Sequence, residues 1–131
     1  MDLLTTHAGL VDFLALYLGS DSEVSLCDTE KVLYIKNAFY EDRVPGAPIG
    51  EMQKSFVADP QFHNIPSTVN YRALTKSGDK LRSATMFIRE DGILIGLLVI
   101  NTRVDELIRC RKVIDRIIQG DESSEPSVPA K

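Results

Sequence analysis

The sequence predicts an α+β fold in which helices at the N-terminal and C-terminal ends flank one five-stranded antiparallel sheet. Apolar residues recur at helical spacing near both ends of the chain. Five short strand-like runs lie between them, interrupted by one short helical segment. The length of 131 residues and the hydrophobic content of 44% suit a single domain with its own core. We therefore expect one folded unit over residues 1–119.

The first predicted element is a helix over residues 3–18. Its apolar residues follow three-, four- and seven-residue spacing, which places them along one helical face. Gly19 stands where such a helix is expected to stop, because glycine readily adopts the backbone conformation that ends a helix. The residues that carry the pattern are Leu3, Leu4, Leu10, Val11, Leu14, Tyr17 and Leu18.

Two strands and a short helix are predicted next. Residues 23–28 alternate with period two, and residues 31–36 form a β-branched and aromatic run after a polar break. Pro48 suits the first position of a helix that ends before Pro60. The sequence thus predicts a strand pair followed by a helix over about 48–58.

The second half of the chain predicts a three-stranded meander. Strand-like runs cover residues 69–75, 81–89 and 94–101, and the segments 77–79 and 90–92 between them have the composition of turns. Neighbouring strands joined by short turns pair antiparallel, so these three runs form one part of the sheet.

A terminal helix is predicted to run to about Gln119. Its apolar residues repeat at helical spacing, and Thr102 with Asp105 forms a capping box at its start. Residues 120–131 are polar, acidic and proline-containing, with almost nothing to bury, so they are predicted to be a flexible linker or tail.

Both faces of the predicted sheet are apolar. Alternate side chains of residues 81–89 and 94–101 point to opposite faces, and apolar residues occupy both sets. The second face therefore needs a cover, which the short helix or the two terminal helices provide, either from the same chain or from a second copy. The terminal helix also has an apolar seam typical of a two-helix coil, which predicts a homodimer. The seam consists of Leu107, Cys110, Ile114 and Ile117.

Charge and composition exclude several classes of protein. A net charge of −4 and a pI near 5.1 leave no overall basic field for a stand-alone nucleic-acid binder. The longest apolar stretch, residues 93–100, is far shorter than the roughly 20 residues that cross a membrane. Cys27 and Cys110 match no redox spacing, and the N-terminus has no secretory pattern, so we expect a cytoplasmic protein without contact to a membrane.

Catalytic and metal motifs are missing from the sequence. His7 and His63 have no Cys or carboxylate cluster at metal-ligand spacing. Cys27 lies on an apolar strand, where a free cysteine usually behaves as a small buried hydrophobe rather than a nucleophile. No nucleophile elbow or phosphate-binding glycine loop is recognisable. We therefore expect no enzymatic activity, no metal and no cofactor.

Four segments carry a resemblance to a known family. The runs Ile35-Lys-Asn-Ala-Phe-Tyr-Glu-Asp-Arg-Val-Pro-Gly-Ala-Pro-Ile49, Leu81-Arg-Ser-Ala-Thr-Met-Phe-Ile-Arg89 and Ile95-Gly-Leu-Leu-Val-Ile-Asn101 resemble the YheO-like PAS domain. The run Glu23-Val-Ser-Leu-Cys-Asp28 is similar to the first strand of that family. The match covers most of positions 8–103 in the right order.

The resemblance implies a PAS-like sensor domain. Such domains are usually joined to a C-terminal helix-turn-helix domain in bacterial transcriptional regulators, so contact with DNA is expected only through a domain that this sequence does not contain. Five positions depart from the family pattern. Cys27 stands where a histidine is usual, Ala38 and Asp42 replace glycines, Gly50 replaces threonine, and Val99 replaces a common cysteine.

Polar residues within the apolar strands are the candidate ligand-binding residues. Ser83 and Thr85 share one face of their strand, and Tyr71 on the preceding strand presents a hydroxyl to the same layer. Arg82 and Arg43 offer planar guanidinium groups for a carboxylate or phosphate. The alternative for the hydroxyls is bonding to neighbouring groups, and for the arginines a surface ion pair.

Asn37 and Asn101 are candidates because they occupy positions within the resembling motifs. The alternative for both is a turn or a helix cap, since Asn101 comes directly before the terminal helix. The sequence therefore predicts a sensory domain that binds a small molecule and dimerises. Its rival is a domain filled by its own side chains that acts only as a dimerisation or docking scaffold.

Overall fold

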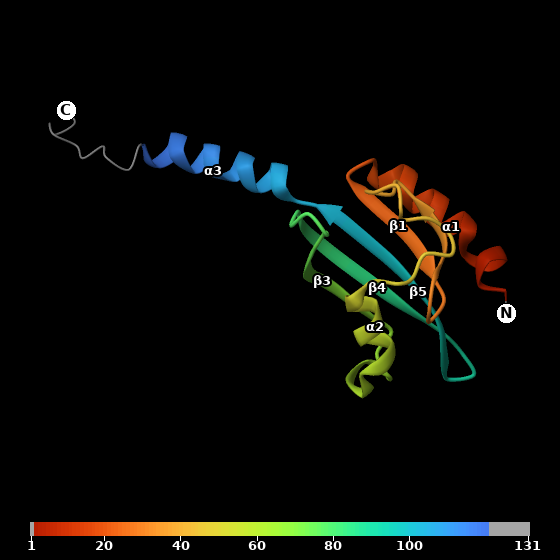
Figure 1. The fold of residues 1–131 in the computed structure, drawn as a ribbon. Coiled ribbons are helices and arrows are strands. Elements are labelled where there is room, and N and C mark those ends of the chain that lie inside the picture. Colours follow the sequence, from red (N-terminus) through yellow and green to blue (C-terminus); the bar gives the residue numbers. More distant parts are fainter. Residues whose placement is uncertain (1, 121–131) are drawn as a thin grey trace, which may run out of the picture.

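The computed structural model describes residues 2–120 and confirms the predicted α+β fold (Figure 1). The five strands are antiparallel in the order β2-β1-β5-β4-β3. The helices and strands are α1 (Leu3–Leu18), β1 (Ser22–Cys27), β2 (Val32–Lys36), α2 (Glu51–Ala58), the short 3₁₀ helix η1 (Pro60–Phe62), β3 (Ser67–Leu74), β4 (Lys80–Glu90), β5 (Ile93–Arg103) and α3 (Asp105–Gln119).

Local sequence signals set the ends of several elements. The Asp2 carboxylate accepts hydrogen bonds from the backbone N–H groups of Leu4 and Thr5 and so caps α1. Gly19 ends the same helix with φ 86°, as predicted. Asp91 and Gly92 both have positive φ values, which is the two-residue turn that favours an antiparallel hairpin between β4 and β5. The predicted meander is therefore confirmed.

The start of α2 differs from the sequence prediction. The helix begins at Glu51, after Gly50 as N-cap, and Pro48 is not its first residue. Pro48 instead forms an isolated β-bridge with Lys31. The carbonyl of Ala47 accepts a hydrogen bond from Val32, so this segment is tied in extended form beside β2 and cannot coil into a helix there.

The predicted capping box at α3 is also wrong. The N-cap of α3 is Val104, and it makes no side-chain cap. The Thr102 hydroxyl bonds to the Ser22 hydroxyl at 2.8 Å, and the Asp105 carboxylate accepts the backbone N–H of Lys80 at 2.8 Å. Both side chains therefore bind the sheet instead of the helix. The predicted tail after Gly120 lies outside the described residues.

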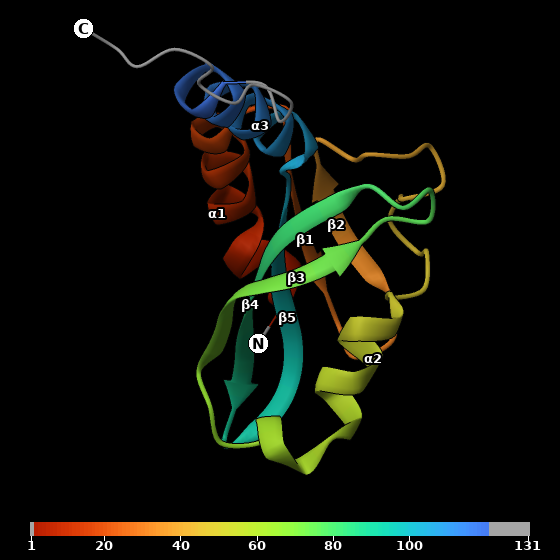
Figure 2. The same ribbon diagram turned by 90° about the vertical axis from the view of Figure 1, so that its left-hand side faces the viewer.

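The sheet separates two hydrophobic cores. Figure 2 shows α1 and α2 on different sides of it. Residues of α1 pack on one face, over β1 and β2, where Val11, Val24 and Leu26 are completely buried. Phe56 of α2 packs on the other face with Phe87 and a further set of apolar side chains. The predicted need for covers on both faces is thus met in part by α1 and α2.

The terminal helix α3 does not cover the sheet. It extends away from the body of the molecule, and none of its residues is buried (Figure 1). Leu107, Ile114 and Ile117 of the predicted seam have exposed fractions of 65%, 54% and 78%. Within residues 2–120 no helix is long and apolar enough to cross a membrane.

Gly96 lies in β5 next to Leu3, at the start of α1. A Cβ atom there would lie 2.8 Å from the carbonyl oxygen of Cys27 and 2.8 Å from a methyl carbon of Leu3. We expect Gly96→Ala to lower the free energy of unfolding by about 1–3 kcal/mol, because the backbone oxygen cannot move aside cheaply. Urea denaturation followed by circular dichroism measures the change.

Gly9 is the matched control for this substitution. It lies within α1, and a Cβ atom there would meet nothing within 4 Å. Gly9→Ala is expected to raise the free energy of unfolding by up to about 1 kcal/mol, because alanine is the better helix former. Equal effects of the two substitutions would contradict the close approach at Gly96.

Candidate functional site

A row of polar side chains crosses four strands on the α2 side of the sheet. The antiparallel register places Tyr71 opposite Ser83, Ser83 opposite Asn101, and Asn101 opposite Glu23. Side chains of directly opposite residues in an antiparallel pair point to the same face and lie close together. The strands β3, β4, β5 and β1 thus each contribute one polar group to this row.

Three members of this row form a continuous chain of hydrogen bonds that ends at an arginine. The Ser83 hydroxyl donates to the Asn101 amide oxygen at 2.7 Å, and the Asn101 amide nitrogen donates to Glu23 Oε1 at 3.2 Å. Arg43 Nε donates to Glu23 Oε2 at 2.6 Å. The Glu23 side chain is 1% exposed, so its charge depends on these partners for compensation.

The loop between β2 and α2 brings Arg43 and a backbone donor to Glu23. Phe39 of this loop donates its N–H to Glu23 Oε2 at 3.0 Å. The guanidinium of Arg103 lies over the Phe39 ring, 4.1 Å from its centroid, which fixes the loop on the end of β5. The Arg43 side chain remains 26% exposed. Arg43 therefore connects the buried chain of hydrogen bonds to the solvent-exposed side of the loop.

A second polar contact lies beside the aromatic part of the core. The hydroxyls of Tyr71 and Thr85 share a hydrogen bond of 2.7 Å, and Thr85 is 1% exposed. The Phe56 ring of α2 meets the Tyr71 ring edge-on at 5.4 Å. Burial raises the pKa of Tyr71, with the bond to Thr85 opposing the shift. This hydroxyl pair is therefore a neutral donor and acceptor at physiological pH.

A cavity of about 610 Å³ opens at the end of this polar row. Its floor includes Glu23, Arg43 and Asn101, and its walls come from the β2–α2 loop, from α2 and from the β3–β4 hairpin. The volume lies within the range of small-molecule sites. The arrangement offers the partly exposed guanidinium of Arg43 to a polar ligand, with apolar lining residues such as Ile49 and Leu74 nearby.

The predicted site residues fall into three groups. Ser83, Asn101 and Arg43 lie in the chain of hydrogen bonds, and Tyr71 with Thr85 lies beside it.

The remaining two lie elsewhere. Arg82 is exposed on the opposite face, since it alternates with Ser83. Asn37 has φ 57° and donates its amide to the carbonyls of Ala15, Gly19 and Ser22, so it fastens the end of α1 to the sheet.

Glu23 is the central residue that sequence reasoning missed. The sequence pattern identifies it only as the first residue of a predicted strand with alternating side chains. The available signal was its position in that alternation, because Glu23 has the same parity as Ser25 and Cys27, which are both buried. A carboxylate at an inward position of a buried strand requires a partner. The sequence alone did not identify Arg43 as that partner.

The two cysteines have opposite environments. Cys27 is 2% exposed, and burial raises the pKa of its thiol to about 11. Cys110 is exposed on α3. We expect iodoacetamide at pH 8 to modify Cys110 at least a hundredfold faster than Cys27, since only the thiolate reacts and Cys27 stays protonated and inaccessible. Mass spectrometry of tryptic peptides measures both rates, and comparable rates would contradict the burial of Cys27.

Among the described residues, no group of three or more His, Cys, Asp or Glu side chains is arranged to hold a metal ion. His7 bonds to the backbone carbonyl of Leu3 at 3.0 Å, and His63 is exposed at the end of η1. The candidate site is therefore a polar-floored cavity rather than a metal centre.

One protein-family model matches the part of the chain that contains all the helices and strands described above. The model of the YheO-like PAS domain matches residues 1–119. The proteins named YheO in Escherichia coli strain K12, Escherichia coli O6:H1 and Shigella flexneri are each 29% identical over 109 residues, which is 79% of this chain. The chain covers 45% of the length of these relatives. No solved structure matches it significantly.

Proposed function

The chain belongs to the family of YheO-like PAS domains, and from this premise we propose that it is a sensory domain that binds a small molecule beside α2. The observation that carries the proposal is the cavity of about 610 Å³ with Glu23, Arg43 and Asn101 on its floor. Its role is recognition without catalysis, in a cytoplasmic protein.

The chemistry of the cavity favours a small ligand with a carboxylate or a similar acceptor group. Arg43 uses Nε for Glu23 and is partly exposed, so its other nitrogens remain available for a planar, bidentate contact. Lys54 and Lys76 line the same cavity at its rim. A ligand carboxylate would therefore add a second anion to an arginine that the protein already orients through Glu23.

The response to the ligand is proposed to pass through the flanking helices of a homodimer. Both terminal helices expose apolar side chains, with Phe13 and Tyr17 on α1 and Ile114 and Ile117 on α3. A second copy of the chain that packs on these side chains would cover the apolar surface that α1 and α3 expose. Ligand binding changes the packing of these helices only if the ligand prefers one of two arrangements. Sedimentation at high micromolar concentration is expected to show a dimer, and a monomer would contradict it.

The output of the whole protein is proposed to be transcriptional regulation. The resemblance implies a C-terminal helix-turn-helix domain, and the chain covers less than half the length of its YheO relatives. Contact with DNA is accordingly assigned to a domain that follows α3 in a longer protein.

A second candidate is a scaffold whose interior is already filled. The observation that favours it is that Ser83, Asn101, Glu23, Tyr71 and Thr85 all bond to one another or to close neighbours. Such a satisfied network needs no ligand. On this reading the exposed helices dock a second copy or another protein, and the cavity is incidental.

A screen distinguishes the two candidates. Thermal unfolding in a library of small carboxylic acids, with native mass spectrometry of the purified protein, is expected to reveal at least one ligand that raises the melting temperature. Arg43→Lys keeps the charge beside Glu23 but loses the planar guanidinium group, so it should lower the affinity for that ligand at least tenfold. Arg82→Ala on the opposite face should leave it unchanged. A library without hits would support the scaffold.

A further inference from the structure

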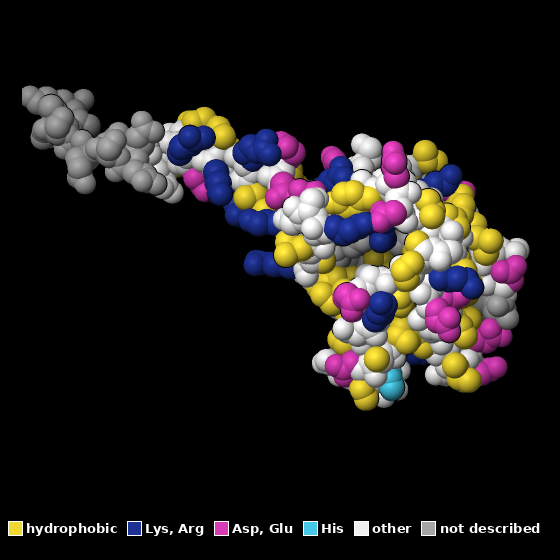
Figure 3. Space-filling model, viewed as in Figure 1, with side chains coloured by type: hydrophobic (Ala, Val, Ile, Leu, Met, Phe, Trp, Pro, Cys, Tyr) yellow, Lys and Arg dark blue, Asp and Glu magenta, His cyan; other side chains and the backbone are white. Residues whose placement is uncertain are grey.

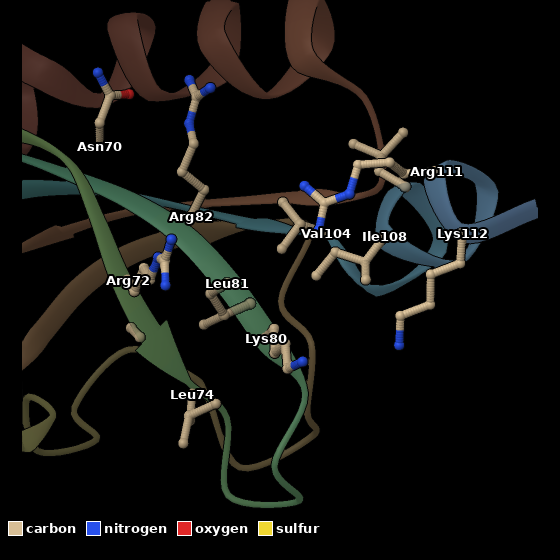
Figure 4. A pocket seen from close by; sticks show the side chains of 12 residues that line it. Asn70, Arg72, Leu74, Lys80, Leu81, Arg82, Val104, Ile108, Arg111 and Lys112 are labelled. Atoms are coloured by element: carbon tan, nitrogen blue, oxygen red, sulfur yellow. The ribbon is translucent and has the colours of Figure 1, made fainter. Parts of the chain in front are cut away.

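A second groove lies where β3, β4 and α3 meet. This open groove has a volume of about 860 Å³ and is rich in cations (Figure 4). Arg72 and Arg82 rise from neighbouring strands, and Arg111 points back toward the sheet from α3. Figure 3 shows the Lys and Arg side chains gathered along α3 and at the adjoining end of the sheet. The cations that line the groove are Arg72, Lys80, Arg82, Arg111 and Lys112.

The register makes this cluster unfavourable in an empty groove. Arg72 lies directly opposite Arg82, and Lys80 follows on the same face of β4. Like charges that face each other across a strand pair destabilise it. A chain with 19 acidic and 15 basic side chains has enough carboxylates to neutralise the cluster. Yet no carboxylate of residues 2–120 lies within ion-pair distance of any of the five.

Several cations elsewhere in residues 2–120 do have carboxylate partners. Six lysine or arginine side chains of this part of the chain form ion pairs outside the groove, and one of these pairs is on α3 itself. The pairs are Lys31–Asp28, Lys36–Asp12, Arg43–Glu23, Lys54–Glu51, Lys76–Asp42 and Arg109–Glu106. Asp105, which directly follows the groove residue Val104, accepts a hydrogen bond from the backbone N–H of Lys80. Within residues 2–120 the groove therefore concentrates positive charge that has no carboxylate partner.

The apolar residues that line the groove indicate which class of anion it can bind. Val104 and Ile108 line it beside the arginines, so a ligand meets apolar surface as well as charge. Three guanidinium groups are suited to the oxygens of phosphate, which accept paired hydrogen bonds. A nucleic-acid backbone would use the cations but not the apolar wall. A small molecule with phosphate groups and an apolar part uses both.

We propose that this groove binds an organic phosphate, held by Arg72 and Arg82 from the sheet and by Arg111 from α3. The bound phosphate ties α3 to the sheet. Without it, α3 has no buried residue and is joined to β4 by the Val104 N–H bonded to the Lys80 carbonyl and by the Asp105 carboxylate. Arg72 and Arg82 lie on the face opposite the Glu23 row, and the groove adjoins the proposed sensory cavity at Ala73, Leu74 and Leu81.

Isothermal titration with ATP and with tripolyphosphate, without divalent metal, tests the site. Both are expected to bind, and ATP more tightly, because its base can use the apolar wall. Arg82→Gln and Arg72→Gln should each weaken ATP at least tenfold, the loss expected for one charge-assisted contact. Arg109→Gln is the control on α3, since Arg109 is already paired, and it should stay within twofold of wild type. Thermal unfolding of each variant verifies that it is folded.

Three results would overturn the proposal. They are no binding of either probe at millimolar concentration, equal losses in Arg82→Gln and Arg109→Gln, and binding of duplex DNA through Arg72 and Arg82 that tripolyphosphate does not displace. The last result would assign the groove to nucleic acid. A spin label on the exposed Cys110 reports on α3, and its mobility should fall when ATP is added. Unchanged mobility with bound ATP would refute the tie between α3 and the sheet.

Discussion

Replacing Arg43 with methionine is expected to lower the free energy of unfolding by about 3 kcal/mol. The substitution leaves the Glu23 carboxylate, which is 1% exposed, without its cation. The remaining donors are the Phe39 N–H at 3.0 Å and the Asn101 amide at 3.2 Å, and neither carries charge. Removing one partner of a buried pair is costly because the other charge stays desolvated. Urea denaturation monitored by circular dichroism measures the loss.

A double-mutant cycle separates the pair from its surroundings. Glu23→Gln removes the charge and keeps an acceptor for Phe39, so the double variant Glu23→Gln with Arg43→Met should be more stable than Arg43→Met alone. Lys36→Met is the control, because Lys36 is half exposed and 3.9 Å from Asp12. Its expected loss is at most about 0.5 kcal/mol. If Arg43→Met lowers the free energy of unfolding as little as Lys36→Met does, water hydrates the Glu23 carboxylate in the variant and the prediction is wrong.

Strand alternation explains why part of the site was predictable. The sequence placed Ser83 and Thr85 on one face and Arg82 on the other, and the structure has the same division, because side-chain direction in a strand depends only on parity. The ends of α1 and the hairpin at Asp91 and Gly92 follow from similarly local chemistry. Such features need only the neighbouring residues in sequence.

The remainder of the site depends on contacts between distant segments. Glu23 and Arg43 are 20 residues apart in the sequence, and no local pattern specifies the path of the loop after β2 that brings Arg43 back to Glu23. Asn101 meets Glu23 only because β1 pairs with β5, a strand order that hydrophobic periodicity does not encode. The wrong helix start at Pro48 has the same origin, since a bridge to Lys31 overrode a good helix-initiating residue. Tertiary pairing decided each of these cases.

Phe56→Ala is expected to lower the free energy of unfolding by about 3–5 kcal/mol and to free α2 from the sheet. Phe56 is 4% exposed and is the one buried residue of this helix. Its ring contacts those of Phe62, Tyr71 and Phe87 edge-on, with centroid distances of 4.8, 5.4 and 5.7 Å. Removing the ring takes away the anchor of α2 and the aromatic contacts together. Denaturant unfolding and amide hydrogen exchange measure the two effects.

The exchange pattern shows whether α2 moves as a separate unit. Amides of residues 51–58 should lose protection in Phe56→Ala, while those of β4 and β5 keep most of theirs, because these strands pair along their whole length. Phe13→Ala is the matched control, since Phe13 is 63% exposed on α1 and its loss should change stability by less than about 1 kcal/mol. Uniform loss of protection across the sheet would contradict the prediction that the Phe56 ring mainly holds α2. Because α2 also lines the cavity that contains Glu23, loss of the Phe56 ring is expected to let that cavity open while the sheet stays folded.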